Sequence, residues 1–208
     1  MKKTAITIFA ALFATAIMAQ DIDLPSPRRT GGMPLMEALA RRRSSREFDG
    51  RALPRQTLSD LLWAAWGYNR PDKRTAPSSR DKQEIELYVA MQDGLYLYDA
   101  EDNRLLMVSD KDLRAMTGTQ PFVAKAPLNI IYVCRKQMIT DKTPDELIAA
   151  TYANTGFIAQ NVYLFCASES LATVVRAMVD REKLAEAMRL PDHSMVTLVQ
   201  SVGYPAAE

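Results

Sequence analysis

The sequence predicts an α+β fold in which a mixed or antiparallel central sheet is flanked by helices. Three observations support this class. Strands alternate as a meander over residues 84–108, a long helical pattern runs over residues 144–171, and helices and strands otherwise alternate irregularly. A doubly wound sheet would show a regular strand–helix repeat instead. A chain of 208 residues that is 48% hydrophobic can bury one full core, so we predict one domain over residues 34–208.

The N-terminus reads as a secretory signal peptide. Lysines at positions 2 and 3 precede an apolar run of fifteen residues that ends near Ala19. This run is shorter than the roughly 20 residues that cross a bilayer, so a membrane anchor is disfavoured. We predict a signal peptide over residues 1–20, cleaved near Ala19 or Gln20, and export to the periplasm or the medium.

A proline-rich leader follows over residues 21–33, and we expect it to be extended and loosely ordered. The domain then opens with a helix after Pro34, which suits a first helical turn. Leu35, Met36 and Leu39 supply apolar residues at helical spacing.

The second helix is predicted to start at Thr57, with Asp60 three residues on as an acidic variant of the capping box, and to end at Gly67. The polar stretch from Tyr68 to Gln83 reads as a long loop, and long loops in compact domains are often functional.

The meander contains a strand over residues 84–92, a turn at Asp93-Gly94 and a strand over residues 95–98. Further predicted elements are a strand over 104–108, a short helix over 110–117, a buried strand over 128–134, a strand over 173–178, a helix over 180–190 and a final strand over 195–204.

The longest helix, from Pro144 to Leu171, carries small residues at Ala149, Ala153 and Gly156. Because a mid-helix glycine costs about 1 kcal/mol, we expect close packing at this face to offset it. We therefore place this helix at the centre of the protein.

The composition excludes several classes of function. With 26 basic and 25 acidic residues, no charge imbalance points to nucleic acid or to an anionic membrane. One histidine and two separate cysteines form no familiar metal motif, and no Gly-x-Ser-x-Gly elbow accompanies His193. Cys134 and Cys166 both fall in predicted core positions as free thiols. A disulfide between them is the alternative, because export would place the protein in an oxidising compartment.

The segment from Arg42 to Arg46 is the strongest chemical signal. Arg42, Arg43 and Arg46 surround the hydroxyl of Ser44, and forked guanidinium groups with hydroxyl donors suit a phosphate monoester. The alternative is a solvated basic run that complements the helix dipole.

Together with motifs further along the chain, this segment resembles the FMN-dependent nitroreductase family, and the hairpin resembles its branch of SagB-type, azoline-oxidising dehydrogenases. The similarity covers about residues 34–205 and rests on the order and spacing of its motifs. These are Arg-Arg-Ser-x-Arg-x-Phe at 42–48, Thr-Ala-Pro-Ser-Ser-Arg-Asp-Lys-Gln at 75–83, Gly-Leu-Tyr-Leu-Tyr-Asp at 94–99, Ala-Pro at 126–127, Gly-Phe-Ile-Ala-Gln-Asn at 156–161 and Val-Gly-Tyr-Pro at 202–205.

The resemblance implies a homodimer with an FMN site built by two subunits, and the helix from Pro144 to Leu171 is the expected central element of the dimer interface. Arg42 and Ser44 would hold the phosphate, and Arg46 would lie beside N1 and the C2 carbonyl, where two-electron reduction places negative charge. The partner subunit would contribute the loop from Pro77 to Ser79. The complete implied set is Arg42, Arg43, Ser44, Arg46, Pro77, Ser78, Ser79, Gln83, Gln120, Ala177 and Met178, with backbone amides at 177–178 facing N5 and Gln120 at the pyrimidine edge.

Three departures from the family pattern stand out. Asp81 replaces a common asparagine, Arg176-Ala177-Met178 replaces a glycine-rich segment beside N5, and the C-terminus ends at Glu208 without the basic residues of many relatives. They bear on one partner-subunit contact, on the shape of the substrate rim and on which residues neutralise the phosphate.

The implied function is an FMN-dependent oxidoreductase working in two half-reactions, from NAD(P)H or another reductant to an organic nitro- or quinone-like acceptor. The flavin would carry the chemistry, tuned by Arg46, so no catalytic side chain and no metal are expected. The alternatives are an azoline-type peptide oxidase and a non-catalytic flavin-binding protein outside the cytoplasm.

Overall fold

The computed structural model describes residues 20–207 and contains a seven-stranded sheet in which every strand pair is antiparallel. The strand order is β1-β6-β5-β4-β7-β9-β8. The strands are β1 (Ile22–Asp23), β4 (Ile85–Met91), β5 (Gly94–Asp99), β6 (Arg104–Ser109), β7 (Leu128–Arg135), β8 (Ala172–Arg176) and β9 (Ser194–Gly203), and a separate pair is β2 (Tyr68–Arg70) with β3 (Lys73–Arg74).

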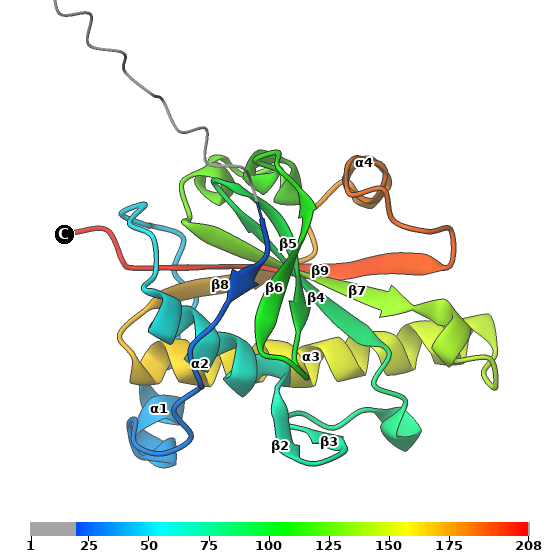
Figure 1. Cartoon of the computed structure of the whole chain (residues 1–208), viewed down its shortest axis with the longest axis horizontal. Helices are drawn as coiled ribbons and strands as arrows, with labels where there is room; N and C mark the ends of the chain where they lie inside the picture. Colours follow the sequence, from blue (N-terminus) through cyan, green and yellow to red (C-terminus); the bar gives the residue numbers. More distant parts are fainter. Residues whose placement is uncertain (1–19, 208) are drawn as a thin grey trace, which may run out of the picture.

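Helices lie on both faces of the sheet, so the predicted arrangement of a central sheet flanked by helices is present (Figure 1). They are α1 (Leu35–Arg41), α2 (Arg55–Trp66), α3 (Pro144–Ser168) and α4 (Arg181–Ala187); short 3-10 turns cover Ser79–Asp81, Arg114–Thr117, Pro121–Ala124 and Lys136–Met138. Figure 1 shows α1, α2 and α3 below the sheet and α4 above it.

Central strand β7 explains how two cores form around one sheet. Ile130 and Tyr132 belong to the larger core with α2 and α3, whereas Ile131 and Val133 belong to the core beneath α4. Because successive side chains of a strand point to opposite faces, a strand covered on both faces is apolar throughout. This is the continuous apolar run that the sequence shows.

Several predicted boundaries were wrong by a few residues. Helix α2 starts at Arg55, with Pro54 rather than Thr57 in the cap position, so the acidic capping box is absent. The hairpin turn is formed by residues 92–93, and Gly94 is the first residue of β5. Gly94 is required there because an added Cβ would lie 2.5 Å from the carbonyl oxygen of Ser109.

Two further segments differ from the predicted elements. The stretch predicted as a helix over 110–117 forms only a short 3-10 turn at its end. The predicted loop over 68–83 contains the β2–β3 pair and another 3-10 turn.

Helix α3 is the longest helix and begins with a full capping box between Thr143 and Glu146. It packs on α1, α2 and the sheet through one face. The predicted close packing at Gly156 is not present within this chain, because an added Cβ there meets no atom within 4 Å. Ala149, Ala153 and Gly156 share the exposed face instead.

The leader over residues 21–33 is extended, as predicted, but the expectation of loose order was wrong. Its first residues form β1 against β6, and Leu24 is buried. The backbone amide and Nε of Arg28 both donate to the carboxylate of Asp60 at 2.7 Å. At its far end, Met33 N donates to Ser168 Oγ at 2.7 Å. The leader therefore fixes α1 and α2 relative to α3.

The fully buried Ser59 offers a test of this role, because its hydroxyl donates to the carbonyl of Pro25 at 2.6 Å. We expect Ser59→Ala to lower the free energy of unfolding by about 0.5–1.5 kcal/mol. Trypsin should also cleave after Arg28 or Arg29 sooner, which N-terminal sequencing of the fragments would detect. The control is Ser26→Ala in the same leader, whose exposed hydroxyl has no partner among residues 20–207. Equal cleavage rates in both variants would contradict the anchoring role.

Candidate functional site

The chain that leaves α1 is fixed along edge strand β8. Ser45 N donates to the carbonyl of Thr173 at 2.9 Å, so the segment extends the sheet edge. Ser44 Oγ lies 2.8 Å from the hydroxyl of Tyr163, which also accepts from Val175 N at 3.0 Å. Tyr163 thus joins the arginine segment, α3 and β8 at one point.

The three predicted arginines have no carboxylate within ion-pair distance among residues 20–207. Arg41, by contrast, pairs with Glu37 one turn earlier. The guanidinium of Arg42 stacks over the ring of Tyr163 at 5.2 Å, while Arg43 and Arg46 are exposed. A groove of about 550 Å³ borders this segment, with arginines 41–43, Ser45 and Tyr163 in its wall. Uncompensated positive charge beside a groove suits an anionic group.

The residues predicted around the flavin ring also come together. Thr119 N donates to the carbonyl of Met178 at 3.3 Å, and Gln120 Nε2 lies 3.3 Å from Met178 Sδ. Gln120 Oε1 is buried without a hydrogen-bond partner. We call residues 117–120 and 177–178 the rim. Phe48 follows the arginine segment and Phe122 follows the rim, each by two residues. Their rings lie 6.1 Å apart, so the two segments approach each other here.

The predicted partner loop lies elsewhere in the chain. Ser79 N donates to Asn154 Oδ1 at 3.1 Å, and Ser78 Oγ accepts from Gln83 N at 2.9 Å. The side chain of Gln83 is used internally, since its Oε1 accepts from Arg74 Nε at 2.9 Å. Gln83 therefore shapes the loop and is not free to bind a ligand through that oxygen.

This loop is strained. Arg80, Asp81 and Gln83 all have φ near +50°, a region that non-glycine residues adopt at a cost. Asp81 accepts from Lys73 Nζ at 2.6 Å, and this bond holds the pKa of its carboxyl below the usual value. The aspartate that replaces the family's asparagine is thus engaged within its own chain.

The two groups of predicted residues do not meet within one chain. The loop contacts α3 at Asn154 and the arginine segment contacts α3 at Tyr163, which is about 13.5 Å along the helix at 1.5 Å per residue. The loop and the arginine segment therefore contact α3 at separate points.

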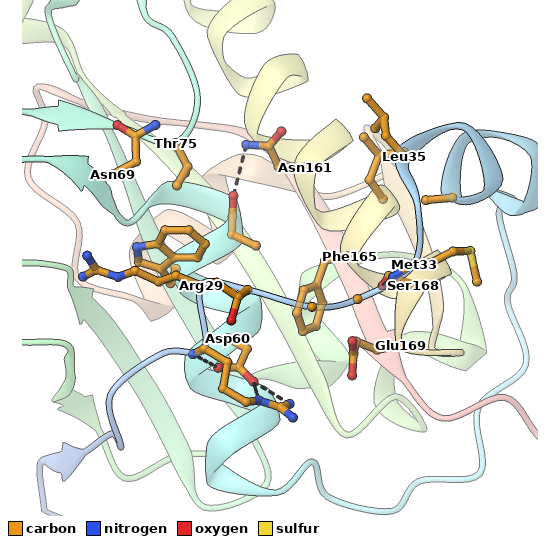
Figure 2. A pocket seen from close by; sticks show the side chains of 18 residues that line it. Arg29, Met33, Leu35, Asp60, Asn69, Thr75, Asn161, Phe165, Ser168 and Glu169 are labelled. Carbon is orange, nitrogen blue, oxygen red and sulfur yellow. Dashed lines mark hydrogen bonds and ion pairs between the residues drawn. The ribbon is translucent and has the colours of Figure 1, made fainter.

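A second pocket lies under the leader, between α2 and α3, and none of the predicted cofactor-binding residues line it. Its volume is about 450 Å³. Asn69, Thr75 and Asn161 lie on one side and Asp60 and Glu169 on the other (Figure 2). The leader forms one wall of this pocket. Because the sequence predicted a loosely ordered leader, it did not indicate the pocket.

No group of three or more metal-ligating side chains occurs among the residues that the structure describes. Cys134 and Cys166 are both buried and free. Burial raises the pKa of both thiols. Within the same residues, no helix is long and apolar enough to cross a membrane.

Comparison with known proteins identifies the family. Residues 39–204 match the model of the Nitroreductase family, and the chain belongs to this family of oxidoreductases. A protein of Methanocaldococcus jannaschii, whose name assigns it to the nitroreductases, is 30% identical over 178 residues, which are 79% of this chain and 88% of that protein.

Solved structures agree with this assignment. A crystal structure described as a nitroreductase from Ralstonia eutropha JMP134 is 42% identical, with 91% of each chain covered and a TM-score of 0.87. The Escherichia coli microcin synthetase complex McbBCD contains a chain of the same fold, with 18% identity, a TM-score of 0.71 and coverage of 97% of this chain and 85% of that one. The nitroreductase-like fold predicted from the sequence is confirmed.

Sequence reasoning missed Tyr163 and the burial of Arg176. Tyr163 stands in an ordinary helical pattern, and no neighbouring residue indicates that its hydroxyl binds both Ser44 and Val175. Arg176 was noted only as a departure in the rim, although a single charge at the end of an apolar strand could have indicated a buried role.

We expect Tyr163→Phe to destabilise the protein, because the amide of Val175 and the hydroxyl of Ser44 both lose a partner. The expected loss is about 1–3 kcal/mol in the free energy of unfolding, measured by urea denaturation. Tyr152→Phe is the matched control on the same helix, since its hydroxyl has no hydrogen bond among the described residues. If Tyr163→Phe lowers the free energy of unfolding no more than Tyr152→Phe does, the hydrogen bonds of the Tyr163 hydroxyl do not hold these segments together.

Proposed function

We propose that this chain is an exported FMN-dependent oxidoreductase that takes reducing equivalents from NAD(P)H or another reductant and passes them to an organic acceptor in a second half-reaction. The observation that supports it most is the unpaired arginine segment fixed to β8 and joined to the rim, in a chain of the nitroreductase family.

The residues present fit FMN. Arg42, Arg43 and the hydroxyl of Ser44 offer charged and neutral donors for a phosphate beside the groove. At the other end, Gln120 presents a buried amide oxygen without a partner, as a pyrimidine edge with N–H donors requires. Met178 is 60% exposed and would narrow access to the ring.

When bound, FMN would supply two-electron chemistry at N5. In this scheme, the backbone at Ala177 and Met178 orients the ring, and Arg46 provides a cation near N1. Tyr163 keeps Ser44 in place and so sets the position of the phosphate.

We further propose a homodimer built on the exposed face of α3. Leu35 and Met36 on α1 and Phe157 on α3 are large apolar side chains with exposed fractions of 62%, 76% and 48%. Such residues gathered near a face of small residues are typical of an interface. An obligate two-fold dimer would bury over ~2,000 Å² in total and bring the partner's loop to the site.

The function is tested by steady-state oxidation of NAD(P)H with nitroaromatic and quinone acceptors, using protein reconstituted with FMN. Turnover with acceptor-dependent rates supports the enzyme. Tight FMN binding without turnover of either nicotinamide would favour the non-catalytic flavin-binding alternative. Oxidation of azoline-containing peptides without nicotinamide would favour the peptide oxidase.

Substitutions of Arg42 and Arg46 should have separate effects, one on FMN affinity and the other on the midpoint potential of the flavin. Arg42→Ala should weaken FMN affinity by about 1.5–3 kcal/mol, roughly 10- to 150-fold, with little change in midpoint potential. Arg46→Ala should lower the potential and slow flavin reduction even when FMN saturates, and about 1.4 kcal/mol corresponds to roughly 30 mV for a two-electron couple. Affinity by fluorescence titration and potential by dye equilibration measure both effects.

Arg51→Ala is the matched control for both, because Arg51 is an exposed arginine that pairs with Asp49 and does not line the groove. If all three substitutions have the same small effect, the arginines are a solvated helix end.

Gly156 tests the dimer. Gly156→Glu should leave the fold intact, since Gly156 is exposed, an added Cβ meets no atom within 4 Å among residues 20–207, and glutamate favours a helix over glycine by about 0.5–1 kcal/mol. It should nevertheless convert the dimer to a monomer by light scattering and lower FMN affinity. Gly156→Ala should remain dimeric. Wild-type protein that is monomeric at micromolar concentration while holding FMN would refute the dimer.

Export predicts a processed N-terminus. Residues 1–20 lie almost entirely outside the residues that the structure describes, so the signal peptide stays a prediction. We expect mass spectrometry of protein purified from its native source to find a chain starting near Gln20 or Asp21. Because lysines rather than twin arginines stand at positions 2 and 3, FMN should be acquired after transport. An intact Met1 on the mature protein would contradict this.

A further inference from the structure

Arg176, the last residue of β8, carries a buried guanidinium that crosses the neighbouring strands. Its side chain is only 7% exposed. Nη1 donates to Ser201 Oγ on β9 at 2.7 Å, and Nη2 donates to the carbonyl of Thr117 at 3.0 Å and lies 3.3 Å from Asn129 Oδ1 on β7. The arginine therefore fastens the start of the rim to the sheet.

No negative charge among residues 20–207 pairs with this cation. Every hydrogen-bond acceptor that it uses is neutral, and no carboxylate lies within ion-pair distance among residues 20–207. Its Nε is buried without a partner, and the ring of Phe122 lies 5.5 Å from its guanidinium carbon. Burial lowers the pKa of Arg176 to about 10, so the group is still charged at neutral pH. An uncompensated buried charge is costly to keep.

The cation lies directly beneath the rim. Arg176 immediately precedes Ala177 and Met178, and its Nε would be 2.8 Å from a Cβ added to Gly118. Gly118 is thus the residue that lets the rim approach the guanidinium so closely. Because the rim excludes water from this side chain, its charge is screened far less than that of the exposed Arg46.

We propose that Arg176 is the buried cation whose charge balances the negative charge that builds up on the flavin during reduction, and that it raises the midpoint potential of the bound cofactor. This inference rests on the proposed FMN site. Two electrons and one proton taken up from the reductant leave one net negative charge on the ring system, and a fixed cation nearby favours that state over the neutral oxidised one. Such a role explains why the chain keeps a charge here without an acidic partner.

The test compares the affinity of the apoprotein for oxidised FMN and for FMN reduced by dithionite. Arg176→Met keeps much of the side-chain length and removes the charge. It should weaken the binding of reduced FMN about tenfold more than that of oxidised FMN, a shift of roughly 30 mV in midpoint potential. Ser201→Ala is the control, since it breaks one hydrogen bond of the same group and keeps the cation; its ratio of affinities should stay at the wild-type value.

If Arg176→Met does not bind FMN, Arg176→Lys provides a second test. A buried lysine amine has a lowered pKa. The potential of this variant should follow the wild type at low pH and fall below it as pH rises through that pKa, because the amine then loses its charge. A purely structural arginine gives no such divergence.

Two results would overturn the proposal: an unchanged ratio of affinities in Arg176→Met, or, if that variant holds no FMN, parallel potentials of Arg176→Lys and wild type at every pH. Wild-type protein that binds no FMN would instead refute the proposed function, and this inference with it.

Discussion

One physical constraint organises the site: the polar side chains on the buried and flanking faces of α3 need hydrogen-bond partners, and each finds its partner in a different segment. Asn154 binds the loop at Ser79, Asn161 binds the carbonyl of Ala64 on α2 at 3.0 Å, and Tyr163 binds Ser44. Ser168 binds the leader. A single helix therefore sets the positions of segments that are far apart in the sequence.

The same helix leaves its other face without partners in this chain. Small residues and Phe157 are exposed there, and the loop and the arginine segment border it at two separate points. In the proposed dimer, a second copy would cover that face and bring its loop to the arginine segment. This is why assembly and cofactor binding are linked in our account.

Charge is distributed unequally across the site. The arginines at 42 and 43 are half-buried or exposed and would meet a phosphate that carries its own charge, so water screens them before it binds. Arg176 is buried and surrounded by neutral acceptors. In our account the phosphate arginines contribute mainly to FMN affinity, whereas Arg46 and Arg176 respond to the change of charge on the flavin, and water screens the buried Arg176 less than the exposed Arg46.

The sequence predicted the α+β class and most elements, because periodicity and turn residues act locally, and the order and spacing of its motifs indicated the family by resemblance. It predicted neither that the leader is fixed nor that the hydroxyl of Tyr163 binds both the arginine segment and β8. Those depend on contacts between residues such as Arg28 and Asp60, which are 32 positions apart and carry no local signal. Burial of Arg176 was missed for the same reason, since a charge at a strand end is compatible with either face.

Bound cofactor tests the central claim most directly. We predict that protein purified from its native compartment, or reconstituted from apoprotein, is yellow, and that denaturation releases FMN at about one molecule per chain, identified by mass. A colourless protein whose fluorescence titration shows no FMN binding would contradict the account.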